Sequence, residues 1–246
     1  MCTFSFIARQ NGCLLAMNRD ERIARGAGHP PSIHKVGDIH AAYPNDGAGG
    51  TWIAANDHGV ALALLNWNDS ATHMVKTASR GKVIPSLIGS NSLLLFRDTI
   101  RRLDLQGMLP FRLIVIFSSE TKVCQWDWDG SFLHSHDHPW EVRHWFSSSL
   151  SDRRAEDIRG AACQQAWRES DSGSKAWLQR LHAEHVDGEG AFSLCVHRQK
   201  VQTLSYSVIE CTPHDVEFAH TIGSPCQPGS MRSLKMERAA LVCQEP

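Results

Sequence analysis

The sequence predicts an α+β fold in which β-sheets pack face to face and helices cover them. Two observations carry this prediction. Strand-like segments come in hairpins, and they are followed by helices, more strands, a second helical region and closing strands. A doubly wound parallel sheet would instead alternate strands and helices one by one. We therefore expect an α+β sandwich.

The first expected element is a β-hairpin formed by residues 2–9 and 13–20, with a Gln-Asn-Gly turn between them. A two-residue Asn-Gly turn places Glu21 opposite Cys2, whereas a three-residue turn with its glycine in the left-handed conformation places Asp20 there. We prefer the second register, because it gathers apolar residues of both strands on one face that ends at a polar cluster. Either register puts an acidic residue beside Cys2.

A long loop and a second hairpin are expected next. Residues 22–50 contain several glycine and proline breakers, which predict a loop. The segments TWIAA and VALALLNW predict two strands that turn at Asn56, Asp57 and Gly59. Apolar residues at three-and-four spacing then predict helix within 80–107.

The second half repeats this order of strands and helices. Strands are expected at 111–118, 121–128 and about 142–147, and the amphipathic stretch 152–185 predicts two helices separated by a Ser-Gly break. The segments AFSLCVH and VQTLSYSVIE predict a closing hairpin, and residues 224–246 are compatible with a terminal helix.

Composition favours one domain over residues 1–246, with a small and near-neutral partner. The chain has 25 basic and 26 acidic residues, so no overall field attracts nucleic acid or an anionic membrane. Its longest apolar runs, LIVIF and VALALL, are far shorter than the ~20 residues of a membrane span. The start of the chain lacks the pattern of a signal peptide. We expect a cytoplasmic protein without a stable membrane anchor.

No metal site is expected. The eight cysteines are spread along the chain without a CxxC pair, which favours reduced thiols over structural zinc. His134, His136 and His138 alternate, but Asp-His-Pro at the end of this run predicts a turn that would spoil a shared strand face. These histidines are expected to be solvated.

Four short motifs occur together in the first quarter of the chain: MCTF, NRDE at 18–21, GGTWIAAND at 49–57 and a later strand ending in Leu65-Asn66-Trp67. As a set they resemble the NRDE family, also called the transport and Golgi organisation protein 2 family, over about residues 1–68. This family is similar to N-terminal-nucleophile hydrolases, particularly choloylglycine hydrolases and penicillin acylases of the cysteine type. The resemblance implies a four-layer αββα sandwich.

The resemblance implies a catalytic role for Cys2. In those enzymes a cysteine exposed at the new N-terminus attacks an amide carbonyl, and its own α-amine acts as the base. Because cysteine is small, we expect the initiator methionine to be removed. An α-amine titrates near ~7.7–8.0 and a thiol near ~8.5, so neighbouring groups need to shift these values only slightly for the amine to hold the thiol proton.

The resemblance also implies roles for other motif residues. Asp20 is expected to orient the ammonium group, and Asn66 occupies a position like that of an asparagine that stabilises the oxyanion. For Asn66 a turn residue that ends a strand is an equally supported interpretation. Asn18, Arg19 and Glu21 are expected to line a substrate pocket, with Arg19 paired to Glu21 or to an acidic ligand.

A second interpretation keeps the fold and pocket without turnover. Proteins that look like this one have been linked to haem trafficking and to lipid or acyl-CoA metabolism, so haem is a possible ligand although no cofactor is required. Cys2, Met17 or a histidine would supply a labile iron ligand. A cleft lined by tryptophans would suit the flat macrocycle. The candidates for that lining are Trp52, Trp67, Trp126 and Trp128.

Overall fold

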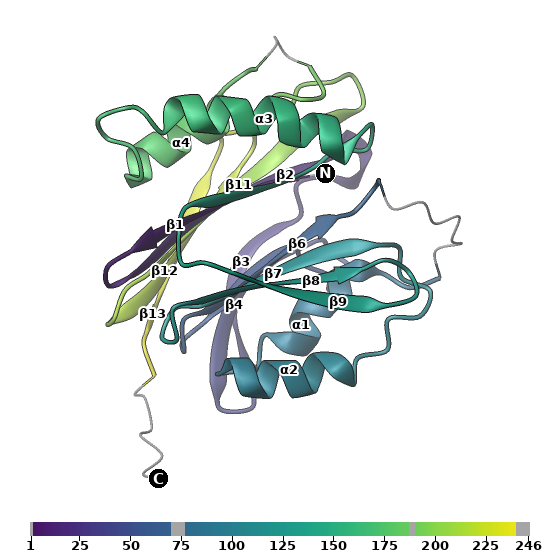
Figure 1. The fold of residues 1–246 in the computed structure, drawn as a ribbon, viewed down its shortest axis with the longest axis vertical. Coiled ribbons are helices and arrows are strands. Elements are labelled where there is room, and N and C mark those ends of the chain that lie inside the picture. The colour runs from purple at the N-terminus through teal and green to yellow at the C-terminus, as the bar shows by residue number, and fades with distance from the viewer. Residues whose placement is uncertain (1, 70–76, 187–189, 240–246) are drawn as a thin grey trace.

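The computed structural model describes residues 2–69, 77–186 and 190–239, and it consists of four layers. Figure 1 shows two stacked β-sheets with one pair of helices outside each sheet. The expected α+β sandwich of αββα type is therefore confirmed. No helix of the described residues is long and apolar enough to cross a membrane.

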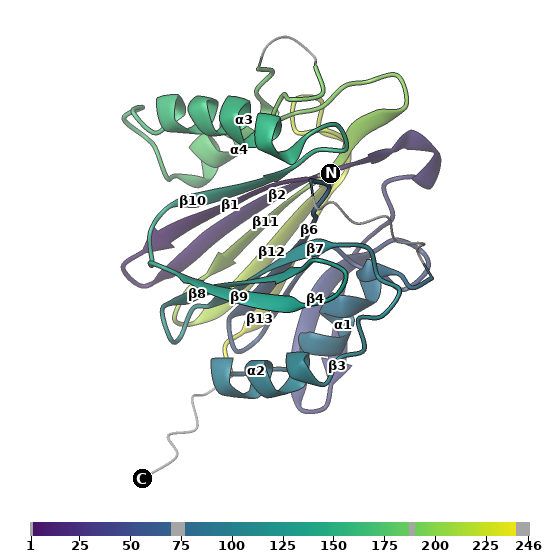
Figure 2. The same ribbon diagram turned by 45° about the vertical axis from the view of Figure 1, so that its right-hand side comes forward.

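The first sheet has six antiparallel strands, and its order is visible in Figure 2. In spatial order the strands are β10 (Arg143–Ser147), β1 (Cys2–Arg9), β2 (Gly12–Arg22), β11 (Val201–Cys211), β12 (Asp215–Ile222) and β13 (Met231–Glu237). The N-terminal hairpin is thus enclosed by strands from the second half of the chain. This enclosure brings residues more than 140 positions apart next to Cys2.

The second sheet has seven strands, and each pairs with its neighbour in the chain. The strands are β3 (His29–Val36), β4 (Ile39–Asn45), β5 (Ile53–Asn56), β6 (Val60–Asn66), β7 (Phe111–Phe117), β8 (Lys122–Trp128) and β9 (Leu133–His138). The hairpin predicted from TWIAA and VALALLNW is confirmed as β5 and β6.

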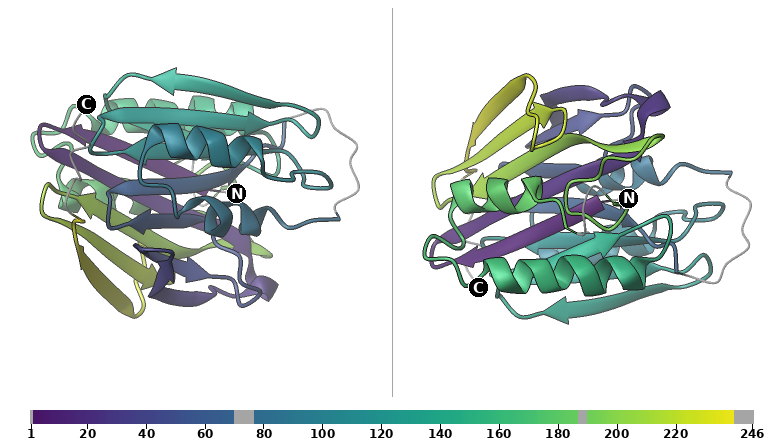
Figure 3. Two further views of the ribbon diagram at one scale, coloured as in Figure 1. Left: turned by 90° about the horizontal axis from the view of Figure 1, so that it is seen from below. Right: turned by 90° about the horizontal axis from the view of Figure 1, so that it is seen from above.

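Three apolar cores hold the layers together. One fills the space between the sheets, the second lies under helices α1 and α2, and the third lies under α3 and α4. Figure 3 shows both helix pairs lying across the outer faces of the sheets. The helices are α1 (Val83–Leu87), α2 (Leu93–Arg101), α3 (Asp152–Ala166) and α4 (Lys175–Ala183), and short 3₁₀ turns occur at Ile23–Arg25 and Arg80–Lys82.

Serine caps define where three of the four helices begin. Ser92, Ser151 and Ser174 each have extended backbone, and each side-chain oxygen accepts a hydrogen bond from the backbone N–H three residues later. The two helices predicted within 152–185 are confirmed as α3 and α4. The helix predicted within 80–107 is confirmed as two helices, α1 and α2, because the chain turns between them at residues 88–92.

The predicted register of the first hairpin is wrong. Cys2 pairs with Arg19, rather than with Asp20 or Glu21, and Arg9 pairs with Gly12. The two-residue turn is therefore Gln-Asn, and its glycine already belongs to β2. Gly12 has φ +125°, and a Cβ there would lie 1.9 Å from the carbonyl oxygen of Cys211 on β11. The glycine serves a close approach of strands rather than the turn.

The loop predicted for residues 22–50 is also wrong, because β3 and β4 form a hairpin there. Two prolines at the start of β3 are tolerated because this strand lies at the sheet edge and its register shifts between His29 and Ser32. In the same way, the terminal helix expected within 224–246 is a strand, β13, over its described part. Residues 240–246 lie outside the described residues.

Two further strands differ from expectation. The hairpin partner of β11 is β12, whereas AFSLCVH is irregular except for one isolated bridge between His197 and Gln202. The turn predicted at the end of the histidine run is the last part of β9. His134 and His136 on this strand are nevertheless about half exposed, as expected for solvated side chains.

Candidate functional site

Cys2 begins β1 and lies between two strands that hold its backbone. On one side it pairs with Ser147 of β10, and on the other with Arg19 of β2. The Cys2 nitrogen donates to the hydroxyl of Ser147 over 2.9 Å. Removal of the preceding residue would leave an α-amine at this nitrogen, already beside a hydroxyl. The pairing thus fixes the position of the Cys2 nitrogen at the end of β1.

A small cavity of about 100 Å³ lies at Cys2 and continues into a larger cleft of about 860 Å³. Residues Asp20, Glu21, Arg25, Asn66 and Arg80 line both spaces. Cys2 lines the small cavity but not the larger cleft. A ligand in the cleft could therefore place one end near Cys2 while the rest lies among charged side chains.

Asp20 anchors a buried polar network beneath Cys2. Its Oδ1 accepts a hydrogen bond of 2.6 Å from the hydroxyl of Thr203, and its Oδ2 lies 3.6 Å from Arg159 of α3. The Arg159 guanidinium also donates to the hydroxyl of Thr3 at 2.9 Å and to the carbonyl oxygen of Cys2 at 3.3 Å. Arg159 is fully buried, so its charge is balanced inside the protein rather than by water.

Burial and charge act together on the acid and the thiol. Burial raises the pKa of the Asp20 carboxyl above its ordinary value, although the charge of Arg159 and the hydrogen bond from Thr203 lower it in part. Burial also raises the pKa of the Cys2 thiol, and the charge of Asp20 adds to this, whereas Arg19 lowers it. The thiol therefore needs a nearby proton acceptor to become a thiolate.

Arg19 lies on the Cys2 face of β2, and its guanidinium is 4.3 Å from the centre of the Trp52 ring. It donates to the carbonyl oxygen of Gly26 at 2.9 Å and lies 3.8 Å from Glu21. Burial lowers the pKa of Arg19, and the charge of Glu21 opposes this shift. The expected pairing of Arg19 with Glu21 is thus present, and Trp52 packs against the cation.

Glu21 remains a charged group at the mouth of the cavity. Burial opposes its ionisation, but a hydrogen bond from the Arg22 backbone and the charge of Arg25 lower its pKa overall. Arg25 donates to Glu21 at 2.7 Å and to Asp46 at 3.2 Å. These contacts leave the mouth of the cavity mixed in charge rather than apolar.

Asn66 ends β6 and lines both spaces, which agrees with its expected position beside the thiol. The chain directly after it is fixed by Asp152, whose carboxylate accepts from the Asn68 backbone at 2.6 Å and lies 3.3 Å from Arg112. Trp67 donates its backbone N–H to Pro110 and is not among the residues that line the two spaces. Its expected binding role gains no support.

Asn18 faces away from Cys2, toward the helices. Its side-chain amide donates to the carbonyl oxygens of His182 and Leu194, each at 2.8 Å, and it is fully buried. Alternation along β2 places Asn18 and Asp20 on this face and Arg19 on the other. Asn18 therefore ties β2 to the end of α4 instead of lining the substrate cleft.

Four residues of the site were not found from the sequence. Ser147 is the first of three consecutive serines, and Arg159 is one of several arginines in an amphipathic helix. Thr203 lies in an ordinary strand pattern, and Arg80 precedes a short helix. No local pattern distinguishes these side chains, because each reaches the site only through the pairing of distant elements.

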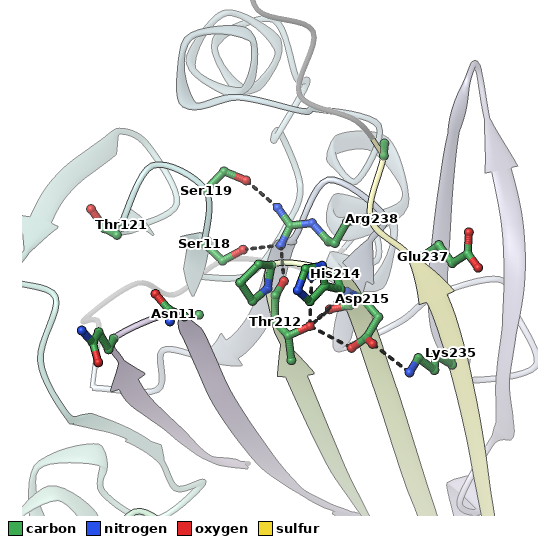
Figure 4. A pocket seen from close by; sticks show the side chains of 14 residues that line it. Asn11, Ser118, Ser119, Thr121, Thr212, His214, Asp215, Lys235, Glu237 and Arg238 are labelled. Atoms are coloured by element: carbon green, nitrogen blue, oxygen red, sulfur yellow. Dashed lines mark hydrogen bonds and ion pairs between the residues drawn. The ribbon is translucent and has the colours of Figure 1, made fainter.

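A second large cavity, of about 680 Å³, lies at the opposite end of β1 (Figure 4). Its half-buried cation is already paired, since Arg238 donates to Ser118 at 3.0 Å and to the carbonyl oxygen of Thr212 at 3.1 Å. Lys235 is likewise paired with Asp215 at 2.7 Å. The residues lining this cavity include no thiol and no buried acid, so the candidate site is the one at Cys2.

The comparison with protein families agrees with the motifs around Cys2. The family model described as Transport and Golgi organisation 2 matches residues 1–152, which is more than half of the chain. The chain belongs to the transport and Golgi organisation 2 family. The matched part of this family member includes Cys2, Asp20, Asn66 and Ser147. No curated protein matches the sequence significantly.

Two solved structures are similar to this family member in fold. Penicillin V acylase from Agrobacterium tumefaciens matches with a TM-score of 0.51 and 11% identity, over 96% of this chain and 86% of the acylase. The C2A mutant of conjugated bile acid hydrolase from Clostridium perfringens matches with a TM-score of 0.47 and 10% identity, over 96% and 92% of the two chains. At such low identity, the acylase match shows the fold alone.

Proposed function

We propose that this protein cleaves or transfers the acyl group of a small amide, with Cys2 as an N-terminal nucleophile. The observation that carries the proposal is the position of Cys2. Its nitrogen lies 2.9 Å from the Ser147 hydroxyl, and Cys2 lines a cavity that Asp20 and Asn66 also line. The similarity to acylase folds supports the architecture, and the chemistry rests on these side chains.

The first step requires that Met1 be removed, so that Cys2 carries a free α-amine. Because burial raises the pKa of the thiol, the thiolate forms only when a base within the site takes its proton. The α-amine is that base, and the resulting ammonium lies close to the buried charge of Asp20. Ser147 holds the nitrogen in place through this transfer.

The thiolate then attacks the carbonyl carbon of the amide and forms a tetrahedral oxyanion. In this proposal the Asn66 side-chain amide donates to this oxygen, a contact worth about 3–4 kcal/mol when it is well aimed. The carbon–nitrogen bond breaks, the leaving amine takes the proton from the ammonium, and a thioester remains on Cys2. Water, or another acceptor, releases the acyl group and returns the proton.

The cleft beyond the cavity indicates a substrate with an anionic group. Five basic residues and two acidic residues line it, although Arg25 is already paired with Glu21 and Asp46. The remaining basic side chains have a net positive charge that would attract a carboxylate or phosphate. They are Arg22, Arg80, Arg198 and Lys200.

The haem-carrier interpretation stays a prediction, and the described residues offer it less support. Met17 has no exposed surface, and Trp126 and Trp128 belong to the core under α1 and α2 rather than to a cleft. The cleft beside Cys2 is lined mainly by charged and polar side chains. A shift in the absorption band of added haem on mixing with the protein would support the haem-carrier function.

Intact mass before and after brief treatment with iodoacetamide tests the proposal. We expect loss of Met1 and one fast adduct that maps to Cys2. Cys226 is the internal reference for the alkylation rate. It is half-buried, whereas the other six described cysteines are buried. Retained Met1, or alkylation of Cys226 in preference to Cys2, would contradict the proposal. A Cys2→Ala variant that still gains the fast adduct would show that another thiol had reacted.

A further inference from the structure

A second cluster of reactive side chains lies behind the Cys2 site, and the proposed acyl chemistry makes no use of it. One ligating atom from each of His185, Cys195, His197 and Cys226 lies within 4.8 Å of the other three. The residues come from three separate segments: the chain after α4, the chain before β11, and the connection between β12 and β13. Within the described residues this is the group of histidines, cysteines and acids that could hold a metal ion.

The distances between these atoms match those of a four-coordinate site. The sulfur atoms of Cys195 and Cys226 are 3.5 Å apart, and Nε2 of His197 lies 3.5 Å from the first and 3.1 Å from the second. Around one zinc ion with ordinary bond lengths, tetrahedral geometry separates two sulfurs by about 3.8 Å and a sulfur from a nitrogen by about 3.6 Å. Cys195, His197 and Cys226 therefore need to move apart by only about 0.3–0.5 Å or less, whereas the ligating atom of His185 lies within 4.8 Å of theirs.

We propose that His185, Cys195, His197 and Cys226 bind one zinc ion in a closed tetrahedral site. Two thiolates and two neutral imidazoles are a common ligand set for structural zinc, and two thiolates neutralise the charge of the ion. Four protein ligands leave no open position for water or substrate. The site therefore has a structural role rather than a catalytic one.

The surrounding backbone already holds the ligands near these positions. The Cys195 N–H donates to the carbonyl oxygen of Glu184 at 3.0 Å, which joins the segment before β11 to the end of α4. His197 lies in an isolated bridge with Gln202. The Cys226 thiol also contacts the hydroxyl of Ser224 at 3.3 Å. Zinc would join three chain segments that otherwise meet mainly through such local contacts.

Thr203 connects this cluster to the acid beneath Cys2. Its hydroxyl accepts from the backbone N–H of Val196 at 2.8 Å and donates to Asp20 at 2.6 Å. Val196 lies between two of the proposed ligands, Cys195 and His197. Bound zinc would fix this segment and, through Thr203, the position of the Asp20 carboxylate.

A disulfide between Cys195 and Cys226 is the competing use of these thiols. A sulfur separation of 3.5 Å is longer than a disulfide bond of about 2.05 Å, and a disulfide would not account for the two imidazoles beside it. We therefore favour the metal, and the test separates the two outcomes.

The test is anaerobic titration of the reduced, metal-free full chain with Co²⁺, which reports tetrahedral thiolate ligation by its absorption. We expect one equivalent of Co²⁺ to give intense visible bands and a thiolate charge-transfer band, and one equivalent of Zn²⁺ to abolish both. Cys226→Ser and His197→Ala should each weaken Co²⁺ binding at least about 10-fold. Cys124→Ala and His134→Ala are the matched controls and should leave the titration unchanged.

Three results would overturn the proposal. The first is a cobalt spectrum without thiolate or tetrahedral bands, and the second is a titration that Cys226→Ser leaves unchanged. The third is a Cys195–Cys226 disulfide that forms in the protein as isolated and persists when zinc and a reductant are supplied together. Thermal unfolding gives an independent check, because zinc should raise the midpoint of the parent chain and not that of Cys226→Ser.

Discussion

The two helical layers of the sandwich bury different kinds of side chain. Every buried residue of α1 and α2 is apolar, and these helices pack on a core of aromatic and aliphatic groups. The buried residues of α3 and α4 include Asp152, Arg159 and His182. The helices beside the Cys2 site therefore bury charged and titratable side chains of their own, which the described residues of α1 and α2 do not.

The two helical layers therefore contribute differently to stability and to the site. Apolar packing under α1 and α2 provides stability that depends little on pH. The polar layer under α3 and α4 costs desolvation energy, and its charges are tolerated because each has a partner. We infer that one layer supports the structure and the other prepares the site, and the following variants separate these roles.

The largest effect is expected at the nucleophile. Cys2→Ala should lower turnover of a cleavable amide by at least about 10⁴-fold, because no other group can form the thioester. The free energy of unfolding should change by about 1 kcal/mol or less, since only a sulfur atom is lost. Steady-state assay and thermal unfolding measure the two quantities. Cys124→Ala should retain activity, and unchanged turnover in Cys2→Ala would remove Cys2 from the mechanism.

The apolar layer should show the opposite behaviour. Phe96 of α2 is fully buried against Trp126 and Phe117, so Phe96→Ala should lower the free energy of unfolding by about 3–5 kcal/mol. The rate of Cys2 alkylation in the folded protein should not change. Leu94, two residues earlier, is 82% exposed, and Leu94→Ala should cost less than about 0.5 kcal/mol in urea unfolding. Equal costs for the two variants would contradict the assigned packing.

Arg159→Met tests the charge balance of the polar layer. It leaves the Asp20 charge buried without its cation, and we expect a loss of about 3 kcal/mol near pH 8. The folded-state pKa of Asp20 is already raised by burial and should rise further. Because a raised acid pKa costs stability above that pKa, the loss should shrink as pH falls and the carboxyl becomes neutral.

Urea unfolding of this variant at pH 8 and pH 5 measures the effect. Adding Asp20→Asn to Arg159→Met should recover much of the lost stability. Arg153→Met on the exposed face of α3 serves as the control. If Arg159→Met lost the same stability at pH 8 and at pH 5, then Asp20 would not change its protonation between these pH values when Arg159 is absent.

Acid should weaken the same layer through one buried imidazole, that of His182, and one half-buried imidazole, that of His144. The hydroxyl of Ser5 lies 2.8 Å from Nδ1 of His144 and 2.8 Å from Nε2 of His182. Burial lowers the pKa of His144 to about 4 and that of His182 to about 3. The unfolded chain binds these protons near pH 6.5, so stability is complete above that value and falls as the pH is lowered toward 4.

We expect each histidine to contribute on the order of 2 kcal/mol to this loss. Thermal midpoints between pH 7 and pH 4 should therefore fall less steeply in His182→Gln than in the parent chain. The exposed His134→Gln variant should follow the parent curve. If His182→Gln and the parent had the same slope, the buried imidazole would not be the cause.

The smallest effect is expected at the rim of the cleft. Lys200→Gln and Arg22→Gln should each raise KM for an anionic amide by about 2–5-fold and leave kcat unchanged, because exposed charges contribute up to about 1 kcal/mol. The effect should weaken as salt increases. Lys35→Gln on the edge strand β3 is the matched control. A neutral amide that shows the same rise in KM would rule out charge recognition.

Local sequence patterns predicted the elements whose signals are local. The hairpin of β5 and β6 was found because Asn56, Asp57 and Gly59 mark a turn between apolar strands. The β3–β4 hairpin was missed because two prolines and several glycines outweigh a strand pattern, although an edge strand accepts them. The register of the first hairpin was missed because Gly12 was taken as a turn residue, whereas contact with Cys211 explains it.

Only the site residues that lie in recognisable sequence motifs could be predicted. NRDE and its companion motifs indicated Cys2, Arg19, Asp20 and Asn66, and the structure brings these four together. Asn18 belongs to the same motif but points to the helices, since strand alternation divides the motif between two faces. Arg159 and Ser147 reach Cys2 from elements more than 140 residues away, and a single sequence does not record such pairings.

The enclosed start of β1 has a practical consequence for producing the protein. Cys2 is paired with strands on both sides, and its nitrogen lies 2.9 Å from the Ser147 hydroxyl. An N-terminal affinity tag that stays attached would keep this nitrogen in an amide and so remove the proposed base. A preparation that keeps such a tag would fail the turnover assay for a reason unrelated to the natural chain, so purification handles belong at the other end.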